Sequence, residues 1–196
     1  MKNFMDAILY VLILVVLIAG FIWMTYNSLV ALRMRVKEAW ADIDVQLKKR
    51  YDLLPDLIET ARKAVAVDEK ILTKVTELRT RAMESASKGI SPEERAKIEG
   101  QLSSMVRDIK VQVEAYPDIK SHGELTNLMD KVTEIEEKIA YARRFLNSNV
   151  MEYNTKIKMF PAVIIANALS FTPENFFAAN EEERKDIKVD LDTKQG

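Results

Sequence analysis

Asp52 and Asp56 are the residue pair whose types and spacing come closest to an acid–base or metal site. They are four residues apart, which places both carboxylates on one face of a helix. Like charges crowded in a cleft raise a carboxyl pKa and can create a general acid or base. The basic residues Lys48, Lys49 and Arg50 are adjacent in sequence, however, so ion pairing on a helix surface explains the same residues without catalysis. We therefore predict surface ion pairs here.

The other reactive residue types are too few or too scattered to form a site. His122 is the only histidine and the chain has no cysteine, so a zinc site would need carboxylates and one imidazole. The five glycines are dispersed, which does not suit a phosphate-binding loop. Lys and Arg total 29 against 30 Asp and Glu, without the basic excess of nucleic-acid binders. We expect no enzyme, no cofactor or metal, no small-molecule substrate and no nucleic-acid partner.

The composition favours long helices. Hydrophobic residues make up 48% of the 196 residues, enough for one domain with a sizeable core beside a membrane segment. Only five Gly and five Pro occur, among many strong helix formers. An all-α fold follows.

A long apolar segment near the amino terminus predicts a membrane anchor. The sequence from Ala7 to Met24 carries no charge, and the first charged residue beyond it is Arg33. As a helix this segment spans about 27 Å, against roughly 30 Å for a hydrocarbon core. Aromatic rings near its end suit the level of the lipid headgroups. The anchor residues include Ala7, Leu14, Leu17, Phe21, Trp23 and Tyr26.

A cleaved signal peptide is the alternative to a retained anchor. The apolar segment is longer than the usual core of a signal peptide, and no small-x-small cleavage site follows it, so we favour retention. Arg33, Arg35 and Lys37 follow the segment, against Lys2 before it. This bias predicts that the bulk of the chain is cytoplasmic and that the three basic residues after the anchor lie near the lipid headgroups.

A first amphipathic stripe runs from Leu29 to Ala82 in steps of mostly three and four residues. It predicts one helix, or two in tandem. Pro55 removes a helical hydrogen bond, but the stripe passes through it in phase, which favours a kink over a stop. A break at Leu54 is the alternative.

Two more long helices and a short one are predicted after this stripe. Ser91 begins the second with an N-cap, a proline at the first helical position and a glutamate three residues after the cap. The third opens near Glu124 and keeps a 3.5-residue apolar period, which indicates coiled-coil-like packing. A short apolar helix starts at Pro161. We predict that the anchor helix continues into an antiparallel bundle of three long helices plus this short C-terminal helix.

These elements divide the chain into four parts. The charged end has little apolar content and is expected to be disordered. The predicted parts are a short N-terminal end (1–6), a transmembrane helix (7–28), a helical-bundle domain (29–178) and a charged tail (179–196).

Three blocks of sequence resemble the LemA family. They are YNSLVALRMRVKEAWADIDVQLKKRYDLLPDLIET at residues 26–60, ARRFLNSNVMEYN at 142–154 and FPAVIIANALSF at 160–171. Leu146 departs from the family pattern, which typically has tyrosine before the asparagine. The resemblance implies a single-pass bacterial membrane protein with a helical, coiled-coil-like domain and no established catalytic activity.

Polar residues flank the anchor or interrupt the third apolar stripe. A buried amide in such a seam costs stability unless it is hydrogen-bonded, and it can fix the register between helices. Hydrogen bonding within one chain is the simpler interpretation, and contacts between subunits or with a membrane partner are the alternative. The candidate interaction or register residues are Tyr26, Asn27, Arg143, Asn147, Tyr153 and Asn154.

The segment from Phe160 to Phe177 is densely apolar. Covering one end of the bundle is its simplest use, and lying against the bilayer or a neighbouring protomer is the alternative. The candidate patch consists of Phe160, Ile164, Ile165, Leu169, Phe171, Phe176 and Phe177.

The leading hypothesis is a membrane-anchored helical scaffold that forms homo-oligomers or organises the membrane or other membrane proteins. Its partners are then the lipid bilayer, further copies of the chain and other membrane proteins. A regulatory adaptor that presents the bundle to a membrane protease or signalling protein is the second hypothesis. An unrecognised hydrolase is the weakest.

Overall fold

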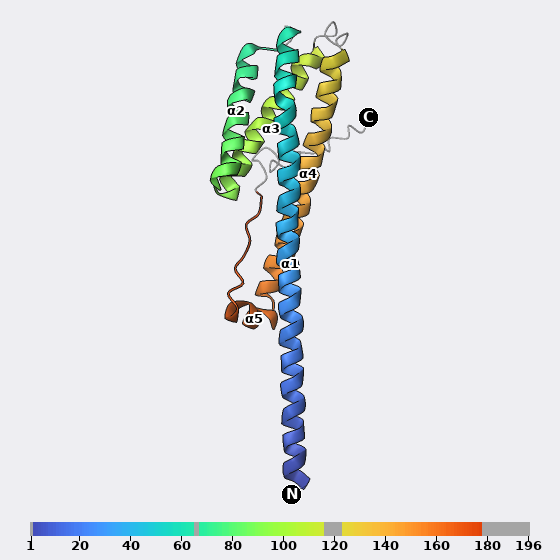
Figure 1. Cartoon of the computed structure of the whole chain (residues 1–196), viewed down its shortest axis with the longest axis vertical. Coiled ribbons are helices and arrows are strands. Elements are labelled where there is room, and N and C mark those ends of the chain that lie inside the picture. The colour runs from blue at the N-terminus through green and yellow to red at the C-terminus, as the bar shows by residue number, and fades with distance from the viewer. Residues whose placement is uncertain (1, 65–66, 116–122, 178–196) are drawn as a thin grey trace, which may run out of the picture. The chain divides into compact units, whose positions relative to one another are not determined.

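The computed structural model describes residues 2–64, 67–115 and 123–177, and all structural statements below concern these residues. Regular structure in this part of the chain consists of five helices, shown in Figure 1. They are α1 (Lys2–Lys63), α2 (Glu69–Lys88), α3 (Pro92–Ala115), α4 (Gly123–Lys158) and α5 (Ala162–Ala168). The predicted all-α bundle is confirmed. The predicted tail at 179–196 and His122 lie outside the described residues.

Helix α1 is continuous through the predicted anchor and well beyond it. Pro55 lies inside it and is exposed, so the helix does not stop at this proline, as the in-phase apolar stripe predicted. The stretch predicted as one helix or two in tandem is two helices, because α1 ends at Lys63 and α2 begins at Glu69. The alternative break at Leu54 is wrong.

Local capping explains where the helices begin and end. The Asp68 side chain accepts a hydrogen bond of 2.8 Å from the Lys70 backbone and starts α2. Gly89 ends α2 with φ at 62°, a left-handed conformation that costs glycine little. Ser91 Oγ accepts from the Glu94 backbone at 3.2 Å, which confirms the predicted N-cap of α3.

The exposed part of α1 contrasts with the rest of the helix. Every residue from Phe4 to Met24 is exposed, and burial starts at Thr25. The window long and apolar enough to cross a membrane has none of its residues buried inside the fold. A core helix of a soluble protein would have most of that window covered.

The described chain divides into two compact units. The first contains α1 up to Lys48 together with residues 137–176, where α1 and α4 run antiparallel and α5 follows (Figure 1). Its core residues follow the three- and four-residue steps predicted for both helices. They include Leu29, Val36, Ile43 and Leu47 from α1, and Ile139, Leu146, Val150 and Ile157 from α4.

The second unit contains the end of α1, all of α2 and α3, and α4 up to Glu136. Helices α2 and α3 are joined by the turn at Gly89 and pack along one another. The core of this unit includes Leu54, Leu57, Leu72, Leu78, Leu102, Ile109, Leu125 and Val132.

Candidate functional site

A stretch that follows α5 is fastened to α1 and α4 by polar contacts in the first unit. We call residues 169–176 the return segment. The Asn154 side chain donates to the Glu174 carbonyl at 2.8 Å and accepts from the Glu174 backbone N–H at 2.9 Å. One amide side chain thereby satisfies both backbone groups of a residue that has no helical partners.

Two further contacts hold the return segment. Arg33 Nε donates to the Glu174 carboxylate at 3.1 Å, and Tyr153 donates its hydroxyl to the Thr172 carbonyl at 3.0 Å. Tyr153 is fully buried, and this burial raises the pKa of its phenol. A buried hydroxyl needs a hydrogen-bond partner, and the Thr172 carbonyl provides it. Tyr153 therefore favours a conformation of the return segment that brings this carbonyl next to it.

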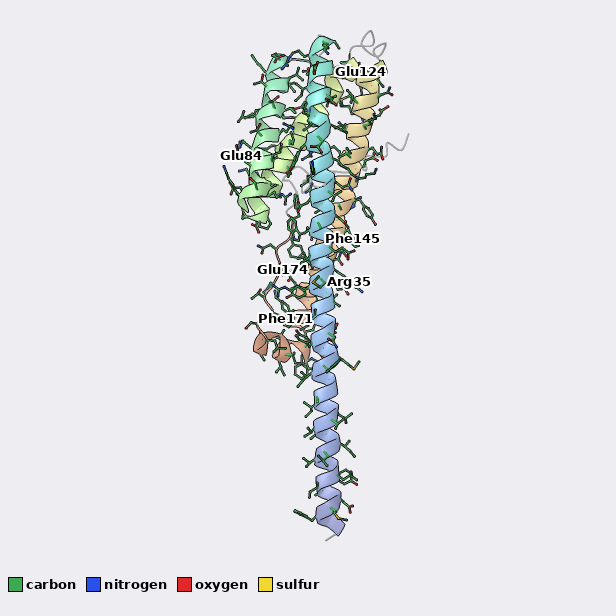
Figure 2. The ribbon with its side chains drawn as sticks, viewed as in Figure 1. Arg35, Glu84, Glu124, Phe145, Phe171 and Glu174 are labelled. Atoms are coloured by element: carbon green, nitrogen blue, oxygen red, sulfur yellow. The ribbon has the colours of Figure 1, made fainter. Side chains whose placement is uncertain are left out.

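An aromatic contact places the start of the return segment beside α1. The rings of Tyr26 and Phe171 lie edge to face, with centroids 6.1 Å apart and planes at 70°. This geometry is favoured between aromatic rings. Since Tyr26 directly follows Thr25, the contact lies where the exposed apolar part of α1 ends. Figure 2 labels Phe171 beside α1.

The apolar patch predicted from sequence divides between core and surface. Ile165 and Phe177 are buried, and Phe171 is partly buried. Other members are exposed, with Phe160 at 79% and Ile164 at 61%. The remaining exposed members are Leu169 and Phe176.

The predicted register residues lie in different environments. Tyr153 and Asn154 form their hydrogen bonds within the chain, to the return segment. Arg143 and Asn147 are partly buried and also have interaction partners, whereas Asn27 is exposed. The simpler interpretation, hydrogen bonding within one chain, therefore accounts for Tyr153 and Asn154.

The three predicted lipid-proximal basic residues also differ. Arg33 is partly buried and its charge is compensated by Glu174, whereas Arg35 and Lys37 are exposed. Arg35 and Lys37 therefore remain the candidates for contact with headgroups, whereas Arg33 holds the return segment.

The second unit contains a buried charge cluster that the sequence analysis missed. We interpreted Arg50 as a surface residue, which is wrong, because its side chain is fully buried. Its guanidinium donates from Nη1 to Glu136 at 2.7 Å and to the Ser103 hydroxyl at 2.8 Å, and from Nη2 to Glu99. Tyr51 donates its hydroxyl to the second oxygen of Glu99, and Ser103 donates to the second oxygen of Glu136 at 2.7 Å.

Burial and charge act in opposite directions on this arginine. Desolvation lowers the pKa of Arg50, but the carboxylates of Glu136 and Glu99 outweigh it, so its pKa is raised. The pKa of Tyr51 is also raised, first by burial and then by the charge and hydrogen bond of Glu99. Both terminal nitrogens of Arg50 have partners, whereas its Nε is buried without one. The cluster links α1, α3 and α4, since separating Arg50 from Glu99 would leave a buried charge unpaired.

The sequence did contain a signal for this cluster. The apolar stripe of the first helix continues from Leu47 through the buried Tyr51 to Leu54, in steps of four and three. Arg50 is three residues after Leu47, which places it on the same apolar face. Glu99 likewise lies between the buried Ile98 and Leu102 of α3.

The aspartate pair is not part of any such arrangement. Asp52 and Asp56 are both exposed on α1. Within residues 2–64, 67–115 and 123–177, no group of three or more His, Cys, Asp or Glu side chains is placed to hold a metal ion.

Comparison with known proteins extends the resemblance seen in the sequence. A family model described as LemA family matches residues 39–191. Magnetosome protein MamQ 2 of Paramagnetospirillum magneticum is 23% identical over 176 residues, covering 79% of this chain and 65% of that protein. Protein LemA of Metamycoplasma hominis is 24% identical over 169 residues, covering 86% of this chain and 74% of that protein. The chain thus spans less than two thirds of the magnetosome relative. None of these names denotes an enzyme.

Proposed function

The chain belongs to the LemA family, and from that premise we propose that it is a single-pass, membrane-anchored helical scaffold whose bulk lies in the cytoplasm. It acts by shape and lateral contact, through further copies of itself or other membrane proteins, and not by catalysis.

The observation that carries this proposal is the continuity of α1. The helix passes without interruption from an exposed part, residues 4–24, that none of the described residues covers, into a part that forms the core. Cleavage of a signal peptide would cut inside this helix, ahead of the buried Thr25. A retained anchor keeps the bundle attached to the bilayer by a helical connection, which has little freedom to bend.

Anchoring favours self-association. Confinement to a bilayer raises the effective concentration of weak lateral contacts. Exposed aromatic residues one helical turn apart, Tyr141 (66% exposed) and Phe145 (45% exposed), provide an apolar contact on the α4 part of the first unit. A second copy anchored in the same membrane could pack laterally against these two residues.

Mass measurement of the full chain in detergent and in lipid nanodiscs tests the proposal. We expect a retained N-terminus, with the 22.4 kDa chain intact, and particles that contain several copies. Tyr141→Ser should reduce the copy number, whereas Val111→Ser, at a 64% exposed position on α3, should not. A chain that stays monomeric in nanodiscs at every concentration contradicts self-association and leaves the adaptor hypothesis.

Orientation has a separate test. The chain has no cysteine, so Ala41→Cys introduces a single thiol at an exposed position of α1. A membrane-impermeant maleimide should label it only after the cells are lysed. Labelling in intact cells would reverse the proposed topology.

A further inference from the structure

We propose that α5 and its flanking residues lie in the headgroup–acyl boundary of the bilayer that α1 crosses, so that each chain contacts the membrane at two points. This inference rests on the proposed anchor. We call the outward apolar residues here the α5 face: Met159, Phe160, Ile164 and Leu169, which are 55%, 79%, 61% and 49% exposed.

The position of α5 along α1 is the first argument. Phe171, three residues after α5, contacts Tyr26, and on α1 the uncovered Trp23 and Met24 precede Tyr26 by less than one helical turn. Two or three residues of helix correspond to about 3–5 Å. The lipid that covers Trp23 and Met24 therefore lies at the level of the return segment's first residues.

The chemistry of the segment is the second argument. No charged residue occurs between Lys158 and Glu174. Helix α5 buries Ala162, Ile165 and Ala166 against the chain and still presents Ile164 outward. The chain buries one side of the segment, and covering the outward apolar residues with an apolar layer would be favourable in proportion to their area.

The charged residues on either side of this uncharged segment also suit a location at the membrane boundary. The Glu174 carboxylate, which would be repelled by anionic headgroups, is paired with Arg33 at 3.1 Å. Lys158 is exposed directly before the α5 face, where a long basic side chain can reach headgroup phosphates while its stem stays in an apolar layer.

A bilayer fits this surface better than a second copy of the chain. The uncovered apolar residues of α1 end beside the start of the return segment, so one apolar phase can cover both surfaces at once. An apolar helix at the boundary gains burial in proportion to its area without needing a complementary protein surface.

The consequence is a fixed orientation of the first unit on the membrane. The return segment is tied to α4 through Asn154 and to α1 through Arg33. If α5 rests in the boundary, it restricts the tilt of the first unit relative to the membrane, because tilting would lift the α5 face out of the apolar layer. Corresponding residues of neighbouring copies then lie at the same height above the bilayer.

Single-cysteine variants of the full chain in proteoliposomes test the inference. A nitroxide label is placed on Ile164→Cys or Ala168→Cys in α5, on Leu14→Cys in the anchor, and on Ser148→Cys, a nearly isosteric change at an exposed position of α4. Ser148 lies ten residues before Lys158, the end of α4, which corresponds to about 15 Å along the helix axis. Its label therefore reports on a part of α4 far from the start of α5. Collision rates are measured with oxygen, which concentrates in the acyl region, and with a water-soluble nickel chelate.

We expect the α5 labels to collide with nickel several-fold less, and with oxygen several-fold more, than the Ser148 label. Ala168→Cys keeps Ile164 in place and exchanges one small residue for another, so it remains informative if Ile164→Cys disturbs the fold. Equal nickel collision rates at the α5 and Ser148 labels, with the Leu14 label protected from nickel, would overturn this inference. The proposed anchor would be unaffected by that result. Exposure of the Leu14 label would overturn the proposed function itself. Protection of α5 from both reagents, with spin–spin broadening between copies, would show that a second chain covers the face instead.

Discussion

Arg79 donates a hydrogen bond of 2.7 Å from Nε to the backbone carbonyl of Tyr51. That carbonyl lies four residues before Pro55, which has no N–H to give it. An arginine of α2 therefore replaces the hydrogen bond that the proline removes from α1. The contact helps α1 to continue through Pro55 and links α2 to the part of α1 that carries Arg50 and Tyr51.

The first prediction is a coupling between Arg79 and Pro55. Arg79→Met leaves the Tyr51 carbonyl without its partner and should cost roughly 1–3 kcal/mol of unfolding free energy. In a Pro55→Ala background the new backbone N–H can bond that carbonyl, so the cost of Arg79→Met should shrink by about 1 kcal/mol or more. Urea unfolding followed by circular dichroism measures both.

Arg81→Met is the matched control for this cycle, because Arg81 is an exposed arginine of the same helix. It should change stability by at most about 0.5 kcal/mol. Equal costs of Arg79→Met with and without Pro55 would show that the arginine acts independently of the proline.

The second prediction concerns the buried arginine. Arg50→Met leaves Glu99 buried without a counter-charge and should destabilise the chain by about 3–5 kcal/mol. The triple change Arg50→Met, Glu99→Gln, Glu136→Gln removes the charges as well and should recover part of the loss. Lys49→Met, at the exposed neighbouring position, should be nearly neutral. Thermal unfolding in detergent ranks the four proteins, and a neutral Arg50→Met would refute a structural role for the cluster.

The third prediction is a loss of stability at alkaline pH through Tyr51. Burial raises its pKa in the folded chain above the ordinary value near 10 in the unfolded chain. The neutral phenol therefore contributes stability that is complete below about pH 10 and is lost as the pH rises further. Tyr51→Phe should be less stable at neutral pH, because the bond to Glu99 is gone, and should lose less stability between pH 10 and 12.

Absorbance of tyrosinate provides the check on this assignment. In denaturant, Tyr51→Phe should titrate one phenol fewer than the unchanged chain. In the folded state, the variant and the unchanged chain should titrate the same number of phenols near pH 10, since Tyr51 is not yet ionised. A missing phenol at pH 10 in the folded variant would contradict the raised pKa.

The fourth prediction concerns the attachment of the return segment. Asn154→Ala removes both hydrogen bonds to the Glu174 backbone and should cost about 1–3 kcal/mol. Its local signature is faster amide hydrogen exchange at Glu174, which loses its acceptor. Asn175→Ala, at an exposed position of the same segment, should leave the exchange rate unchanged. Unaltered exchange in Asn154→Ala would mean that other contacts suffice to hold the segment.

The fifth prediction separates backbone conformation from packing at Gly89. An added Cβ there meets no atom within 4 Å, so only the positive φ of 62° penalises Gly89→Ala. The expected cost is about 1 kcal/mol, and Gly89→Asn should cost less. Gly123→Ala, which also has open space but no positive φ, should cost nothing comparable. Thermal unfolding compares the three variants.

The sequence by itself determined the helical class, the long apolar segment of α1 and the start of α3 at its Ser91 cap, because these depend on residues close together along the chain. Periodicity also indicated that α1 passes through Pro55. The family membership was visible in contiguous blocks for the same reason.

Only the tertiary structure decided which polar residues are interior. Arg50 reads as one more basic residue after Lys48 and Lys49, and it becomes a core residue because Glu99 and Glu136 come to it from positions 49 and 86 residues away. Asn154 likewise acquires its partner only when the chain turns back past α5. A buried charge or amide is stable only with its partner in place, and local sequence does not specify a partner supplied by a distant helix.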